Sequence, residues 1–121
     1  MTSKRAEIAD MNLGELQSRA LRATGLLKAM ANPARLMVLC QLAEGEKSVG
    51  ELESVVKLSQ SALSQHLALL RSRGLVKPRR EGQTIFYALE GSEAPALLAA
   101  LYEVYCSKVG KPASRRASAA A

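Results

Sequence analysis

The sequence has few of the residues from which metal sites and base-stacking surfaces are usually built. Its 121 residues include one histidine, one phenylalanine and no tryptophan, and aromatic residues make up only 3% of the chain. A metal site with several histidine ligands is therefore excluded, as is an aromatic platform for single-stranded nucleic acid. With 48% hydrophobic and 23% charged residues, the composition is otherwise that of a folded domain, and the length allows one such domain.

Long apolar segments are also missing. The longest strongly apolar stretch, residues 94–102, is far shorter than the roughly 20 residues that span a bilayer. Residues 1–10 are polar and carry both signs of charge, unlike a secretory signal. We therefore expect no membrane partner, and we expect Cys40 and Cys106 to be reduced thiols in a cytoplasmic protein.

Acidic residues are absent from one long stretch in the middle of the chain. No acid lies between Glu53 and Glu81, and the segments on either side are each neutral, so the whole net charge of +6 comes from this stretch. Its basic residues are Lys57, Arg71, Arg73, Lys77, Arg79 and Arg80. A localised basic surface is typical of a domain that binds a polyanion such as DNA. A solvated face that lacks acids by chance is the alternative.

Apolar periodicity predicts helices in the N-terminal third of the chain. Apolar residues recur every three or four positions through residues 7–31, where Gly14 and Gly25 are expected to break or bend the helix. The pair Asn32-Pro33 then supplies an N-cap and a proline suited to the first helical position. A second helix is therefore expected to begin there.

Two further capping residues predict a helix–turn–helix. Ser48 opens an S-x-x-E capping box, and Ser59 precedes a helix that is expected to stop at Gly74. Strand-forming residues follow, which predicts a β-hairpin of residues 75–80 and 84–90. A helix–turn–helix followed by a hairpin is a winged helix, in which the second helix of the pair enters the DNA major groove.

The fold predicted is thus mostly α-helical with one small hairpin, in a single domain. Ser92 is expected to cap a last helix that runs to about Lys108. The DNA-binding and dimerisation domain is predicted at residues 7–108, between a disordered start at 1–6 and a disordered basic tail at 109–121.

The helix after Ser59 is predicted to contact bases. Leu63, Leu67 and Leu70 fall on one buried stripe at 100° per residue, and the opposite side is short, polar and uncharged. Such side chains let a helix approach base edges and hydrogen-bond to them. The residues of this helix expected to contact DNA are Ser59, Gln60, Ser61, Ser64, Gln65 and His66. A purely solubilising role is the alternative, and a half-buried position is the alternative for His66.

Basic and polar residues on and beside the hairpin predict contacts to the DNA backbone or the minor groove. These residues are Arg71, Lys77, Arg79, Arg80, Gln83 and Thr84. Charges on edge strands also prevent aggregation, and one residue can serve both roles.

Three segments of the sequence resemble the ArsR/SmtB family of winged-helix repressors. They are residues 27–36 (LKAMANPARL), 58–76 (with LSQSALSQHL and RSRGLV) and 79–89 (RREGQTIFYAL), within a resemblance that covers about 16–106. The resemblance implies a cytoplasmic, homodimeric bacterial repressor that an inducer releases from double-stranded operator DNA. In this family the first and last helices of two subunits pack together, and the corresponding residues here are Leu13, Leu16, Leu97, Leu98, Leu101 and Tyr105.

The resemblance also bears on the inducer. Metal sensors of the family carry a cysteine pair before the recognition helix, or acidic and histidine ligands on the last helix. Residues 48–56 and 97–108 contain no Cys-x-Cys and no histidine, so neither a metal nor another cofactor is expected. The placement of Cys40 and Cys106 is instead similar to the dithiol branch, of the SqrR and BigR type, which senses persulfide, polysulfide or oxidants by bridging two thiols.

Other interpretations of the cysteines remain open. The residues alone favour packing, because Cys40 shares an apolar stripe with Leu36 and Leu39, and the nearby Glu44 is expected to raise its pKa. The resemblance favours a redox switch in which the two thiols are bridged. Such a bridge requires the Cα atoms of Cys40 and Cys106 to lie within ~7 Å, or to reach that distance by a modest helix shift. The bridge can be a disulfide or contain further sulfurs.

Three other functions are weighed against this switch. The first is an ArsR-type repressor with structural cysteines that responds to a different inducer or to none. The second is a non-specific architectural DNA-binding protein, which would bind with steep salt dependence and little sequence preference. The third is a thiol enzyme, but the chain is short for a substrate pocket and its one histidine has no partners for catalysis, so no enzyme and no catalytic residue is predicted.

Overall fold

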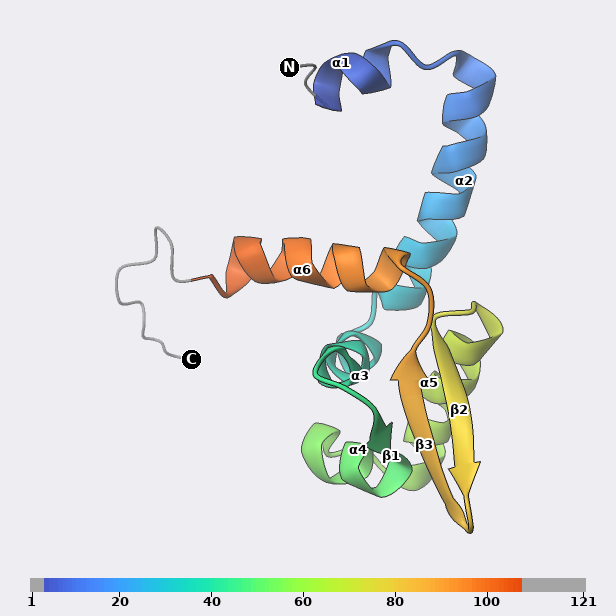
Figure 1. The fold of residues 1–121 in the computed structure, drawn as a ribbon, viewed down its shortest axis with the longest axis vertical. Helices are drawn as coiled ribbons and strands as arrows, with labels where there is room; N and C mark the ends of the chain where they lie inside the picture. Colours follow the sequence, from blue (N-terminus) through green and yellow to red (C-terminus); the bar gives the residue numbers. More distant parts are fainter. Residues whose placement is uncertain (1–3, 108–121) are drawn as a thin grey trace.

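The helices and strands of the protein occur in the order that the sequence predicts, with one short strand added. The computed structural model describes residues 4–107, and Figure 1 shows the path of the chain. The elements are α1 (Lys4–Ala9), α2 (Leu13–Met30), α3 (Pro33–Ala43), β1 (Lys47–Ser48), α4 (Val49–Val56), α5 (Gln60–Ser72), β2 (Val76–Glu81), β3 (Thr84–Leu89) and α6 (Glu93–Tyr105). The architecture is mostly helical with a small antiparallel hairpin, which is a winged helix.

Side-chain caps begin α3, α4 and α5 at the predicted residues. The side chain of Asn32 accepts a hydrogen bond from the backbone N–H of Arg35 at 3.1 Å, and Ser59 accepts one at 3.2 Å from the N–H three residues later. Ser48 and Glu51 form a complete capping box, with bonds of 3.1 and 2.7 Å. Each cap pairs N–H groups that the first turn leaves unpaired, so it determines where the helix starts.

The N-terminal helical segment divides at a different place from the one predicted. The break falls at residues 10–12, and both Gly14 and Gly25 lie inside α2. Asn12 causes the new start, because its side chain accepts a hydrogen bond from the N–H of Glu15 at 2.8 Å. A glycine inside a helix costs only about 1 kcal/mol and need not end it, whereas the capping bond of Asn12 satisfies an N–H of the first turn and so marks where α2 begins.

The two ends of the described chain also differ from the prediction. Residues 4–6 are helical within α1, although the sequence predicts a disordered start at 1–6, and residues 1–3 lie outside the described part. Ser92 precedes α6 with backbone angles in the helical region and makes no capping bond, and α6 ends at Tyr105. Lys108 and the tail at 109–121 lie outside the described residues.

A three-stranded antiparallel sheet of order β1-β3-β2 lies beside α5. The strands β2 and β3 form the wing, with Arg79 opposite Phe86, and a tight turn at Gly82 in the left-handed region (φ 63°) joins them. The short strand β1 pairs Lys47 with Tyr87. The sequence shows no sign of β1, because two residues carry no periodicity and only the pairing with β3 defines the strand.

Leucine side chains from three helices form the centre of the core. Leu39 of α3, Leu52 of α4 and Leu63 and Leu70 of α5 are all fully buried, and Leu67 is 2% exposed. The predicted buried stripe of α5 is therefore confirmed. Each such side chain contributes about 1.5–3 kcal/mol by leaving water, so these contacts orient α5 about its own axis.

The first half of α2 and the end of α6 extend beyond this core (Figure 1). Leu13 and Leu21 on α2 are 71% and 75% exposed, and Tyr105 at the end of α6 is 72% exposed. Leu98, which the resemblance assigns to a subunit contact, is instead buried in the core of its own chain. That side of α6 packs on α3, so it is not free to face a second copy.

The caps at Ser48 and Ser92 provide a matched test of this account. We expect Ser48→Ala to lower the free energy of unfolding by about 1 kcal/mol, because the capping box is lost. Ser92→Ala should change it by less than about 0.5 kcal/mol, because Ser92 makes no capping bond. Urea denaturation followed by circular dichroism measures both values, and equal losses would contradict the assignment.

Candidate nucleic-acid interface

The N-terminal half of α5 presents polar side chains to solvent. The burial of Leu63 and Leu67 turns the opposite side of the helix outward. The predicted DNA-contacting residues that lie exposed there are Ser59, Gln60, Ser61, Ser64 and Gln65. His66 is half-buried at the edge of this surface. Five short, uncharged side chains at the start of a helix suit close approach to base edges in a major groove.

A hollow of about 550 Å³ separates α5 from the wing. Predicted DNA-contacting residues from both elements line it, namely Gln60, Ser64 and Arg71 from α5 and Gln83 from the wing. The apolar part of its lining includes Ala68, Ile85 and Tyr87. A backbone strand that passes between a groove-bound helix and a wing would lie in such a hollow, with hydrogen-bond donors on both sides.

The alternation of side chains along β2 and β3 gives the wing two faces. Ile85 lines the hollow, and its partner across the hairpin is Arg80, so Arg80 lies on the face toward α5. Lys77 and Arg79 alternate with it and therefore lie on the opposite face, which we call the outer face of the wing. The structure thus separates basic residues that the sequence analysis treats as one group.

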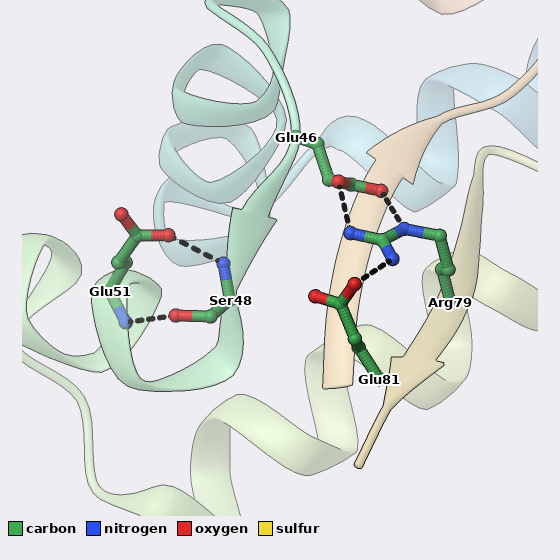
Figure 2. Close-up of polar contacts among 5 residues, drawn as sticks. All are labelled: Glu46, Ser48, Glu51, Arg79 and Glu81. Atoms are coloured by element: carbon green, nitrogen blue, oxygen red, sulfur yellow. Dashed lines mark hydrogen bonds and ion pairs between the residues drawn. The ribbon is translucent and has the colours of Figure 1, made fainter. Parts of the chain in front are cut away.

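On the outer face, Arg79 contacts two carboxylates, which Figure 2 shows, and an aromatic ring. Its Nε and Nη2 donate hydrogen bonds of 3.0 and 2.8 Å to the two carboxylate oxygens of Glu46, and its Nη1 lies 3.6 Å from the carboxylate of Glu81. Its guanidinium carbon lies 4.6 Å from the centre of the Phe86 ring. The hydrogen bond between Arg79 and Glu46 lowers the pKa of Glu46 and raises the pKa of Arg79, because it stabilises both charged forms.

The two cysteines lie on helices that pack against each other. Cys40 is on α3 and Cys106 directly follows α6, and both are exposed free thiols. Partial burial is the larger cause that raises the pKa of the Cys40 thiol, and the negative charge of the Cys106 thiolate is the smaller one. The causes of this rise are therefore desolvation and Cys106, and not Glu44, which the sequence predicts as the cause.

Neither a metal-binding cluster nor a membrane-spanning helix is found among the described residues. No group of three or more His, Cys, Asp and Glu side chains within residues 4–107 is placed to hold a metal ion. Over the same residues, no helix has both the length and the apolar character needed to cross a membrane. The candidate sites are therefore the surface formed by α5 and the wing, and the pair Cys40 and Cys106.

Two residues of this region, Glu46 and Tyr87, carry no signal in the sequence that points to a site. Glu46 lies 33 residues from Arg79 along the chain, so no local pattern relates the two. Tyr87 lines the hollow two positions after Ile85. Strand alternation from Ile85 is the signal that identifies Tyr87 once the orientation of the wing is known.

Comparison with known proteins gives a consistent family assignment. The family profile described as "Bacterial regulatory protein, arsR family" matches residues 32–77, from the cap of α3 to the start of β2. The chain is 54% identical over 98 residues to the transcriptional activator HlyU of Vibrio cholerae, covering 81% of this chain and 91% of that protein.

Two solved structures resemble this fold at similar levels. Reduced HlyU from Vibrio cholerae has a TM-score of 0.76 at 53% identity, covering 78% of this chain and all of that one. The transcriptional repressor BigR from Xylella fastidiosa has a TM-score of 0.74 at 43% identity, covering 80% and 99% of the two chains. The chain therefore belongs to the ArsR family of bacterial transcriptional regulators, which bind DNA and are not enzymes.

Proposed function

We propose that this regulator is a homodimeric repressor whose binding to operator DNA ends when Cys40 and Cys106 are bridged. The proposal rests chiefly on one observation. Both thiols are exposed, Cys40 on α3 and Cys106 directly after α6, and these two helices pack together; the contribution of the Cys106 charge to the raised pKa of Cys40 supports a pairing of the two. Residues 7–108 would then act as one DNA-binding and dimerisation domain.

The chemistry of the bridge needs an electrophilic sulfur or an oxidant. One cysteine thiolate attacks the sulfane sulfur of a persulfide or polysulfide, which leaves a persulfide on the protein and releases the donor thiolate. The second thiolate then attacks this protein persulfide and expels hydrosulfide, which yields a disulfide. Reaction with another sulfane sulfur before closure gives a longer bridge. A peroxide acts through a sulfenic acid that the second thiol resolves with loss of water.

The bridge would act on DNA binding through α6. A covalent link between Cys40 and Cys106 ties the end of α6 to α3, the helix on which α5 packs. If α6 contributes to the dimer contact, a shift of its end changes the separation of the two α5 helices. Two recognition helices must stay about 34 Å apart to enter successive major grooves, so the link would weaken operator binding.

Exposed apolar side chains support a homodimer formed by the ends of the fold. Large apolar side chains are exposed on α1, α2 and α6, and exposed apolar surface is typical of interaction sites. They are Ile8, Leu13, Leu16, Leu21, Tyr102, Val104 and Tyr105. Three residues of the face that the sequence predicts, Leu13, Leu16 and Tyr105, belong to this set. The other three do not, because Leu98 is buried and Leu97 and Leu101 are partly buried against the core of their own chain.

A repressor with structural cysteines that answers to another inducer, or to none, is the second candidate. The raised pKa of Cys40 favours it, because less of the reactive thiolate is present at neutral pH. The exposure of both thiols favours the switch instead, because a reagent can reach them. Cysteine substitutions separate the two candidates.

We expect Cys40→Ser and Cys106→Ser to bind operator DNA as the reduced wild type does, because neither residue lies on α5 or the wing. Polysulfide should weaken the binding of the wild type by about tenfold or more and leave both variants unchanged. Fluorescence anisotropy with a duplex selected from a random pool measures this, with random duplex at the same salt concentration as the control.

Two results would contradict this scheme. Equal release of a single-cysteine variant would show that the bridge is not the switch, and equal affinity for random duplex would favour an architectural DNA-binding protein. Whole-protein mass spectrometry after persulfide or peroxide treatment identifies the bridge. A loss of two hydrogens indicates a disulfide, and added sulfur atoms indicate a longer bridge.

The pKa of Cys40 gives a pH-dependent prediction. In the wild type, the rate of Cys40 alkylation should rise with pH through a midpoint above that of an ordinary cysteine. Cys106→Ser removes the neighbouring charge, so the midpoint should move to lower pH while desolvation still keeps it above the ordinary value. Iodoacetamide labelling followed by peptide mass spectrometry measures both profiles, and an unchanged midpoint would show that the two thiols are far apart.

The dimer contact can be tested on α2. Leu13→Gln combined with Leu21→Gln should shift the protein from dimer to monomer, because both side chains would be removed from the proposed contact. Val55→Gln, at an apolar residue of α4 that is 44% exposed, should leave the dimer intact. Sedimentation velocity measures the change, and a persistent dimer in the α2 variant would place the contact elsewhere.

A further inference from the structure

We propose that Arg79 is a positioning residue that fixes the wing against the body of the domain, and that Arg80 supplies the contact of the wing to the DNA backbone. This inference rests on the binding of DNA through α5 and the wing. The two arginines are adjacent in the sequence and have the same charge, but they lie on opposite faces of the sheet and so are assigned different roles.

The donors of Arg79 already have partners within the chain. The two bonds to Glu46 are parallel and bidentate, which is the strongest arrangement between a guanidinium and a carboxylate. The ion pair with Glu81 (Figure 2) and the contact with the ring of Phe86 hold the guanidinium further. To reach a phosphate, Arg79 would have to break this set of contacts and leave two carboxylates near the DNA.

The contact between Glu46 and Arg79 crosses the whole sheet. Glu46 directly precedes β1, Arg79 lies on β2, and the sheet order places β3 between them. Phe86, over which the guanidinium lies, belongs to this central strand. The contact therefore connects the two edge strands over the middle one, where β1 itself supplies only two paired residues.

The same contact also connects the wing to the segment between α3 and α4. The hairpin otherwise meets this segment through the pairing of β1 with β3. A second connection at Glu46 limits rotation of the wing about β3, so that its tip at Gly82 and Gln83 keeps one angle to α5. A fixed angle lowers the entropy lost when helix and wing bind DNA together.

Arg80 has the opposite environment. It is exposed, it has no ion pair within residues 4–107, and its cross-strand partner Ile85 lines the hollow beside α5. Its guanidinium is therefore available for a phosphate on the side of the wing that faces the recognition helix. The charge of Arg79, in contrast, is neutralised by Glu46.

Salt-dependent operator binding separates a phosphate contact from a positioning contact. Loss of one phosphate contact lowers the slope of log K against log salt concentration by about 1. We expect Arg80→Gln to lower both the affinity and this slope. Arg79→Gln should lower the affinity by about two- to fivefold with the slope unchanged, the range expected for an exposed ion pair.

Glu46→Gln is the decisive variant, because it removes a negative charge near the DNA. Electrostatics alone predicts tighter binding, whereas the positioning role predicts a loss equal to that of Arg79→Gln. The double variant should bind no more weakly than either single variant, because both break the same contact. Glu44→Gln is the matched control, since Glu44 pairs with Lys47 and does not touch the wing.

Tighter binding by Glu46→Gln, or a slope lowered by about 1 in Arg79→Gln, would overturn the proposal and assign Arg79 to the DNA backbone. Circular dichroism of each variant confirms folding. The Nε–H resonance of Arg79 gives a readout that needs no DNA. It should exchange slowly with water in the wild type and fast in Glu46→Gln, and the resonances of residues 82–84 should shift.

Different results would contradict the proposed repressor function and the positioning role of Arg79. If the wild type shows no preference for a selected operator, the proposed repressor function fails while the resonance of Arg79 still reports the contact with Glu46. If the wild type binds specifically and Arg79 Nε–H exchanges fast, the positioning role fails by itself.

Discussion

The burial of one leucine stripe determines how this protein can meet DNA. Leu63, Leu67 and Leu70 are buried in the core where α5 packs against α3 and β2, and this contact sets the rotation of α5 about its axis. Since α5 has one buried side, the polar residues on the other side must face outward together. The hollow beside the wing and the separation of the wing faces both follow from this orientation.

The basic excess lies in the part of the chain that contains α5 and most of β2, although Arg73 lies beside α2 and Lys57 follows α4. The net charge of +6 arises between residues 54 and 80, which include α5 and most of β2. Not all of this charge is available to DNA, because Glu46 neutralises Arg79 on the outer face. The position of a basic residue on the sheet therefore matters as much as the count of basic residues.

The cysteines and the exposed apolar residues lie outside this DNA-facing region. Cys40 lies on α3 and Cys106 directly follows α6, and the exposed apolar residues lie on α1, on α2 and near the end of α6. A reaction at the thiols can thus affect DNA binding only through the arrangement of helices. This is the physical basis for joining the proposed dimer contact and the proposed thiol switch in one mechanism.

The sequence by itself determined the features that depend on neighbours along the chain. The caps at Asn32, Ser48 and Ser59, the leucine stripe of α5 and the hairpin all arise from residues a few positions apart, whose chemistry acts locally. Tertiary structure alone decided the pairing of β1, the burial of Leu98, the exposure of Cys40 and the contact between Glu46 and Arg79. Each of these depends on which segments meet after folding, and no residue type or spacing encodes that meeting locally.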